Sequence, residues 1–294
     1  MMSESKVAQP LLNITFQALL IPAGHAMAAD AQRSHMEGKP AAFVAAADVV
    51  LEVDDQRFLA HTQLLSAESP VLAELLAEYA GSPPPGGELP VVALAKKGDT
   101  EALGTVPEQR CRTFAALLDT VYNPARRMTA RWEVEQLKWV VSMAHVLQMD
   151  ALLFLCDEVG ARELARHFKT VSGVSWARGG ARPHATAVGR TDTEWCRLGE
   201  KCGLYKSMAV ALREALKKVT GAEKQAGVNA DVVRGFIRGF GAPVRGVILD
   251  EMVEAMHPSK GAARFDDKLA SDDPLAAKLR DAMSLGELPA WSQS

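Results

Sequence analysis

Adjacent carboxylates are the residues of this chain that come nearest to catalytic chemistry. Two acidic pairs occur, Asp157-Glu158 and Asp250-Glu251, and two carboxylates that face each other can act as a general acid and a general base. Both pairs fall in helical patterns, where neighbours in sequence point in different directions. We therefore interpret each pair as part of a solvated helix face, and not as an acid and a base that work together.

The cysteines and histidines lack the spacing of a metal site. No C-x-x-C pair and no H-x₃₋₅-H motif is present, so we expect no structural zinc. Free thiols in apolar helical patterns behave as small buried hydrophobes, which favours a reducing, intracellular location, in the cytoplasm or the nucleus. Of the seven histidines, His61 has a defined context, and we expect a partly buried imidazole satisfied by nearby backbone. The four cysteines are Cys111, Cys156, Cys196 and Cys202.

Motifs for phosphate binding and hydrolysis are missing as well. The chain has no G-x-x-x-x-G-K-[ST], no G-x-G-x-x-G after a strand, no G-x-S-x-G and no H-E-x-x-H. We therefore expect no cofactor and no enzymatic activity. A net charge of −3 argues against a surface that binds nucleic acid, because phosphate contacts need clustered Lys and Arg. No run approaches the ~20 apolar residues that span a bilayer, so we expect no membrane segment.

The N-terminal apolar run over residues 11–21 has two interpretations. Asn13, Thr15 and Gln17 interrupt it with period two, which favours a strand. The alternative is a secretory signal, with Ala26-Met27-Ala28 as the small-residue cleavage site.

The elements that position these residues begin with a hairpin. Residues 48–53 alternate partly, residues 54–56 are a polar turn, and residues 57–60 are typical of a returning strand. A short helical segment follows over 61–65. Ser69 can then cap a helix that begins at Pro70 and runs to Tyr79. Residues 81–87 hold three prolines between glycines and predict a loop, and residues 89–94 predict a further strand.

Three helical segments follow this strand. Thr105 and Glu108 have the spacing of a capping box, which predicts a helix that ends at Asn123-Pro124. A second helix is expected from near Thr129, and residues 148–150 are a tight connection to a third. Residues 143–149 can be aligned with residues 198–204, and helices follow both, which we interpret as a recurring helix-turn-helix pair.

The domain organisation that we predict has five parts. They are a poorly specified lead over 1–47, a compact domain over 48–168, a linker over 169–193, a helical region over 194–257 and a polar tail over 258–294. Asp272-Asp273-Pro274 in this tail predicts the start of one last short helix.

The compact domain resembles the BTB/POZ family. Its first half follows the pattern D-V-x-Φ-x-V…F-x-A-H-x-x-x-L…S-x-x-Φ, in which Φ is hydrophobic. Its second half follows F-x-x-L-L-x-x-Φ-Y and then A-x-x-L-x-M-x-x-L-x-x-x-C. The matching residues are Asp48, Val49, Val53, Phe58, Ala60, His61, Leu65, Ser69, Leu72, Phe114, Leu117, Leu118, Tyr122, Ala144, Leu147, Met149, Leu152 and Cys156.

The resemblance implies an α+β fold, with a helical cluster flanked by a short β-sheet and followed by an all-α, BACK-like region. It also implies a protein–protein interaction adaptor that forms a homodimer and recruits substrates to a cullin scaffold of a ubiquitin ligase. The cullin-facing surface would then involve Leu76, Glu78, Tyr79 and Tyr122. The alternative is an oligomerisation scaffold without a ligase role.

Two positions depart from the family pattern. Cullin-binding members often carry a hydrophobic-x-Glu motif in the loop after Tyr79, where this chain has residues 80–83 (AGSP). Repressor members place a basic residue after the motif histidine, where this chain has Thr62.

Overall fold

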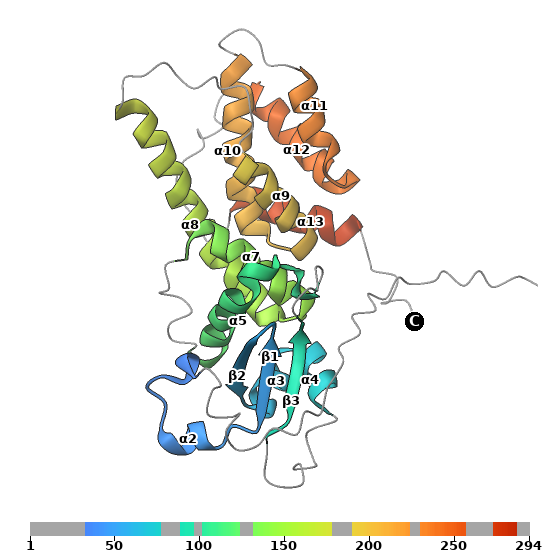
Figure 1. Cartoon of the computed structure of the whole chain (residues 1–294). Coiled ribbons are helices and arrows are strands. Elements are labelled where there is room, and N and C mark those ends of the chain that lie inside the picture. The colour runs from blue at the N-terminus through green and yellow to red at the C-terminus, as the bar shows by residue number, and fades with distance from the viewer. Residues whose placement is uncertain are drawn as a thin grey trace, which may run out of the picture. The chain divides into compact units, whose positions relative to one another are not determined.

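The computed structural model divides the chain into two compact units. The first holds residues 1–122 with 146–148, and the second holds residues 123–145 with 149–294. The structure describes residues 33–77, 89–96, 102–123, 132–177, 190–223, 230–256 and 273–286. Figure 1 shows strands in the blue-to-cyan part of the chain and helices throughout its green-to-red part. The predicted α+β class, with an all-α C-terminal region, is confirmed.

The first unit is built on a three-stranded sheet in the order β2-β1-β3. Strand β1 (Val49–Val53) pairs antiparallel with β2 (Gln56–Ala60) and parallel with β3 (Val91–Ala95). The two-residue turn between β1 and β2 begins at Asp54, whose φ of 54° suits the short polar side chains of turns. All five residues of β3 are buried, as expected for a strand paired in parallel. The predicted hairpin and third strand are confirmed.

Short helices and one long helix complete the first unit. Ser69 precedes a helix that begins at Pro70, as predicted, and the long helix ends at Tyr122, before Asn123-Pro124. The long helix packs beside β1 and the first 3-10 turn. The elements are η1 (Ser34–Met36), α2 (Ala41–Ala45), α3 (Thr62–Glu68), α4 (Pro70–Ala77), η2 (Ala102–Gly104) and α5 (Pro107–Tyr122).

The second unit is helical, and one central helix packs against most of the others. That helix, α10, lies against α8, α9, α12 and α13. The elements are α7 (Val134–Val146), α8 (Asp150–Ala177), α9 (Arg190–Cys202), α10 (Tyr205–Glu223), α11 (Ala230–Arg238), α12 (Ala242–Met256) and α13 (Pro274–Gly286).

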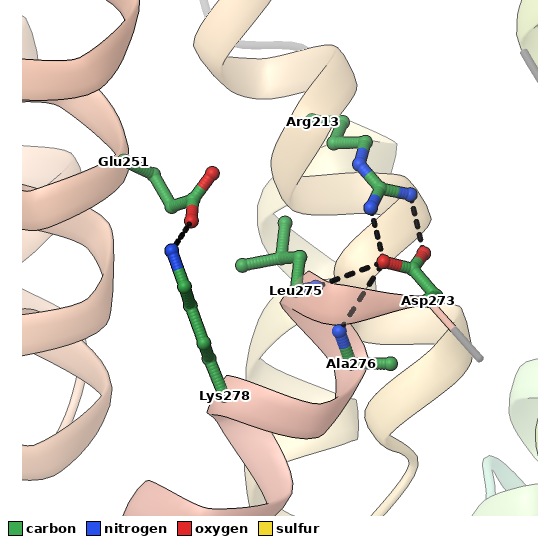
Figure 2. A network of polar contacts seen from close by, with 6 residues as sticks. All are labelled: Arg213, Glu251, Asp273, Leu275, Ala276 and Lys278. Carbon is green, nitrogen blue, oxygen red and sulfur yellow. Dashed lines mark hydrogen bonds and ion pairs between the residues drawn. The ribbon is translucent and has the colours of Figure 1, made fainter. Parts of the chain in front are cut away.

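Two ion pairs hold the last helix in place, and Figure 2 shows both. Asp273 forms an ion pair with Arg213 of α10, and its carboxylate also accepts the N–H of Leu275 at 2.9 Å, so it caps α13. Lys278 of α13 donates to Glu251 of α12 at 2.7 Å. The helix start predicted at Asp272-Asp273-Pro274 is confirmed, and residues 274–286 of the expected polar tail belong to the packed unit.

The recurring helix-turn-helix pair is also found, in the predicted alignment. The N–H of Met149 donates to the carbonyl of Ala144 at 2.9 Å, and the N–H of Leu204 donates to the carbonyl of Gly199 at 2.9 Å. A residue with positive φ precedes each donor, Gln148 at 52° and Gly203 at 71°. In both turns the donor lies five residues after the acceptor, which is the six-to-one hydrogen bond that ends many helices, and the next helix begins directly after it.

Three predicted boundaries differ from the structure. Helix α8 continues to Ala177 and α9 begins at Arg190, so both ends of the expected 169–193 linker are helical. A single Gly173 weakens a helix by about 1 kcal/mol, which does not end it. Helix α7 begins at Val134, later than the start predicted near Thr129, which lies outside the described residues. The remaining domain borders stay predictions.

The predicted capping box at Thr105 does not form. Helix α5 begins at Pro107, because proline fits the first helical position, so Val106 and not Thr105 precedes the helix. The hydroxyl of Thr105 is buried and has no hydrogen-bond partner in the described part of the chain.

Candidate functional site

His61 is the centre of a polar and aromatic cluster in the first unit. Its Nε2 lies 2.8 Å from the carbonyl oxygen of Phe43, which can only accept, so Nε2 carries the proton. Its Nδ1 is then an acceptor for the hydroxyl of Tyr122 at 3.0 Å. The same hydroxyl accepts the backbone N–H of His61 at 2.8 Å. The ring is therefore satisfied on both sides, and the prediction of a structural imidazole satisfied by nearby backbone agrees with this geometry.

Ring contacts extend this cluster to a second histidine, His35. Its ring meets that of Tyr122 edge to face at 4.7 Å, and its Nε2 donates to the carbonyl of Leu59 at 2.8 Å. The ring of Phe43 lies 4.4 Å from that of His61. Burial lowers the pKa of His35 and raises the pKa of Tyr122, because desolvation opposes the charged form of each. Both side chains are therefore neutral at pH 7, which is typical of packing and not of proton transfer.

Two polar motif residues cap the N-termini of helices in this unit. Asp48 accepts the N–H of Thr62 at 2.7 Å, so its carboxylate caps α3 from another element. Ser69 accepts the N–H of Leu72 at 3.0 Å and donates to the carbonyl of Leu147 at 2.5 Å, so one hydroxyl caps α4 and satisfies a distant carbonyl. The role predicted for Ser69 is confirmed. The in-trans cap made by Asp48 was not predicted.

A buried arginine supports the hairpin turn. Arg110, which is fully buried, donates to Asp54 at 2.9 Å, and the thiol of Cys111 donates to the carbonyl of Val53 at 3.1 Å. Burial and the nearby Asp54 carboxylate raise the pKa of Cys111 to about 11. This thiol is therefore protonated and unreactive at pH 7.

The remaining motif residues build the apolar core. The rings of Phe58 and Phe114 meet edge to face at 5.2 Å. Burial raises the pKa of Cys156 to about 12, so this thiol behaves as the small hydrophobe expected from the sequence. The buried apolar motif residues are Val49, Val53, Phe58, Ala60, Leu65, Leu72, Phe114, Leu117, Leu118, Ala144, Leu147, Met149, Leu152 and Cys156.

Asp157 overturns one interpretation from the sequence. It is 7% exposed, so it does not belong to a solvated face. Its carboxylate accepts the N–H of Ser207 at 2.7 Å and that of Lys206 at 3.0 Å, while the hydroxyl of Ser207 donates to the carbonyl of Asp157 at 3.0 Å. Asp157 of α8 therefore caps α10. Desolvation raises its pKa, and the bonds to these amides oppose that rise.

A signal for this cap was present in the sequence. The residue before α10 is Leu204, which has no side-chain acceptor for the free amides at the helix start, so an acceptor had to come from elsewhere. Glu251 is likewise 7% exposed and not solvated, because Lys278 covers its carboxylate. Asp250 is exposed, as expected.

The residues predicted to face a cullin lie in different environments. The side chains of Leu76 and Tyr122 are buried, because both pack into the first unit, so they would support such a surface from below and not form it. Glu78 and Tyr79 lie outside the described residues. The surface itself stays a prediction.

Metal clusters and membrane-spanning helices are absent from the described residues. Within residues 33–77, 89–96, 102–123, 132–177, 190–223, 230–256 and 273–286, no three His, Cys, Asp or Glu side chains come together as metal ligands do. None of the helices described there has the length and apolar character needed to cross a membrane.

Comparison with known proteins agrees with this geometry. The family model of the BTB/POZ domain matches residues 43–162. The matched range covers β1 to β3, α3 to α5, α7 and the first half of α8. No curated protein matches the chain significantly. The predicted resemblance is confirmed, and residues 43–162 of this chain are a BTB/POZ domain, a protein–protein interaction module.

Proposed function

We propose that this chain is a non-enzymatic adaptor, in which the BTB/POZ domain contacts a shared scaffold and the helices after it hold a second protein. The observation that carries the proposal is the cap that Asp157 makes for α10. Asp157 lies on α8 inside the matched domain, whereas α10 lies beyond it. The extension is thus anchored by hydrogen bonds to a helix of the matched range, which suits an extension that stays attached to the domain it follows.

Packing around this cap supports a permanent attachment. Gly160 of α8 approaches α10 so closely that an added Cβ would lie 2.5 Å from the hydroxyl oxygen of Ser207. Lys206 also forms an ion pair with Glu158. Interiors packed this closely have one preferred arrangement and resist sliding.

The scaffold that we propose is a cullin of a ubiquitin ligase, in the cytoplasm or the nucleus. The family resemblance suggests this partner, and the free state of the four cysteines agrees with a reducing compartment. The experiment is a pull-down of the full-length chain with purified cullin scaffolds. Tyr79→Ala should weaken capture, whereas Arg280→Ala, on an exposed part of α13, should leave it unchanged.

A full-length chain is needed for this test. A truncation near Phe168 would remove α10 and expose the part of α8 that α10 covers. The truncated chain would lose the apolar burial between these helices, so a failure to bind would not separate misfolding from a missing surface. Single substitutions in the full-length chain keep α10 in place and avoid this confusion.

An oligomerisation scaffold without a ligase role is the second proposal. The sequence AGSP at residues 80–83, in place of a hydrophobic-x-Glu motif, favours it. A folded chain that binds no cullin at micromolar concentration, yet sediments as an oligomer, would support this scaffold and exclude the ligase adaptor.

A further inference from the structure

Helix α12 carries apolar side chains on two opposite faces. Val244 and Ile248 point inward and are buried in the second unit. Leu249 and Val253 point outward and are 50% and 54% exposed. A helix on the surface of a domain normally has one apolar stripe, and a second stripe marks a contact with another molecule.

The outward residues follow the spacing of a helix-pairing seam. Ala242, Gly246, Leu249 and Val253 are all exposed and are separated by four, three and four residues. In heptad positions they are d, a, d and a. A Cβ built at Gly246 would have no atom within 4 Å, so the space beside it is open. Small residues at Ala242 and Gly246 would let a second helix approach closely.

Charges beside this seam indicate what the second helix is. Arg245 occupies the g position and Asp250 the e position, and both are exposed. In a parallel pair, the g position of one helix meets the e position of the other helix five residues later. Arg245 of each copy would therefore face Asp250 of the other copy. In an antiparallel pair a positions face d positions and each flank meets the same flank, so Arg245 on the g flank would not meet Asp250 on the e flank. The helix is therefore complementary to itself in the parallel orientation.

We propose that α12 pairs with α12 of a second copy of this chain as a parallel two-stranded contact. Val253 at an a position and Leu249 at a d position are the combination that favours two strands. The helix is already formed and packed on its inner face, so pairing does not have to nucleate it. Two heptads bury little area, so the contact forms as the protein concentration rises. The site lies outside residues 43–162, so it does not depend on cullin binding.

Disulfide trapping in the full-length chain tests this pairing. In a parallel pair Val253 lies beside Val253, so V253C should give a cross-linked dimer under mild oxidation. Asp281 on α13 has a side chain that is 70% exposed and lies off the seam, so D281C is the matched control. The wild-type chain controls for the native thiols. Equal rates for V253C and D281C would overturn the proposal.

A charge swap then tests the register. In the V253C background, R245D places like charges together at both flanks and should slow cross-linking about tenfold. Adding D250R restores opposite charges and should restore the rate. A double variant that stays as slow as R245D would overturn the parallel register. A mixture of A242C and V253C chains that cross-links faster than V253C alone would show an antiparallel pair, in which these d and a positions face each other, and would contradict the proposal.

Discussion

Replacing Gly160 by alanine should test the contact between α8 and α10. Its effect on the free energy of unfolding should change sign when the hydroxyl of Ser207 is removed. A Cβ at this position would lie 2.5 Å from the hydroxyl oxygen of Ser207, closer than any real Cβ contact. The next neighbours, Leu137 Cδ2 and Ser207 Cβ, would lie at 3.4 and 3.5 Å, which is ordinary contact. The clash therefore comes from one atom, the hydroxyl oxygen.

The magnitude follows from two opposing effects. Forcing an extra methyl group into a packed interface costs about 1–3 kcal/mol. Alanine in place of glycine inside a helix stabilises it by about 0.5–1 kcal/mol. We therefore expect G160A to lower the free energy of unfolding by about 1–2 kcal/mol. In an S207A background the offending oxygen is gone, so the same substitution should raise the free energy of unfolding by about 0.5 kcal/mol.

Urea unfolding followed by tryptophan fluorescence is a suitable assay. Trp139 on α7 and the fully buried Trp195 on α9 belong to the second unit, so their emission reports on the unit that contains this contact. G246A is the matched control, because a Cβ there meets open space and should stabilise α12 by about 1 kcal/mol in either background. If G160A costs the same with and without the Ser207 hydroxyl, the proposed packing is wrong.

Three further predictions concern the first unit. Y122F removes the hydroxyl that holds both the backbone N–H and the Nδ1 of His61, and should cost about 2 kcal/mol in thermal unfolding followed by circular dichroism; a loss below about 0.5 kcal/mol would contradict the assigned bonds. S69A removes a helix cap and a donor to Leu147, and should cost about 2 kcal/mol in the same assay, whereas an unchanged midpoint would exclude both bonds. The pKa of His35 is lowered by burial, so its contribution to stability is complete above pH 6.5 and is lost as the pH falls through 6.5 towards the folded pKa. H35Q should therefore flatten the fall in melting temperature between pH 7 and pH 5, and equal slopes would contradict this role.

The sequence predicted the parts of the fold that depend on local chemistry. The hairpin, the Ser69 cap and the turn after α7 each lie within a few residues, and their signals are the residue types themselves. The alignment of residues 143–149 with 198–204 anticipated two turns with the same hydrogen bond. Local patterns were sufficient in these cases because the free energy of a cap or a turn comes from neighbouring residues.

Contacts between distant elements could not be predicted in the same way. Asp157 looked solvated because it and Ser207 of α10 are fifty residues apart in the sequence, and only the packing of their helices brings the carboxylate to the free amides. The hydroxyl of Tyr122 meets His61 across a similar separation. Leu76 looked like part of a surface because the sequence does not specify which face of α4 is buried. Each of these depends on tertiary packing, which overrides local preference.

Binding of the full-length chain to purified cullin scaffolds, measured by biolayer interferometry, is the decisive measurement for the adaptor proposal. We expect saturable binding to at least one scaffold with a Kd in the micromolar range or tighter. The Asp157-anchored extension should stay folded in that complex, with unchanged tryptophan emission. A folded chain that binds none of the scaffolds would exclude the ligase adaptor.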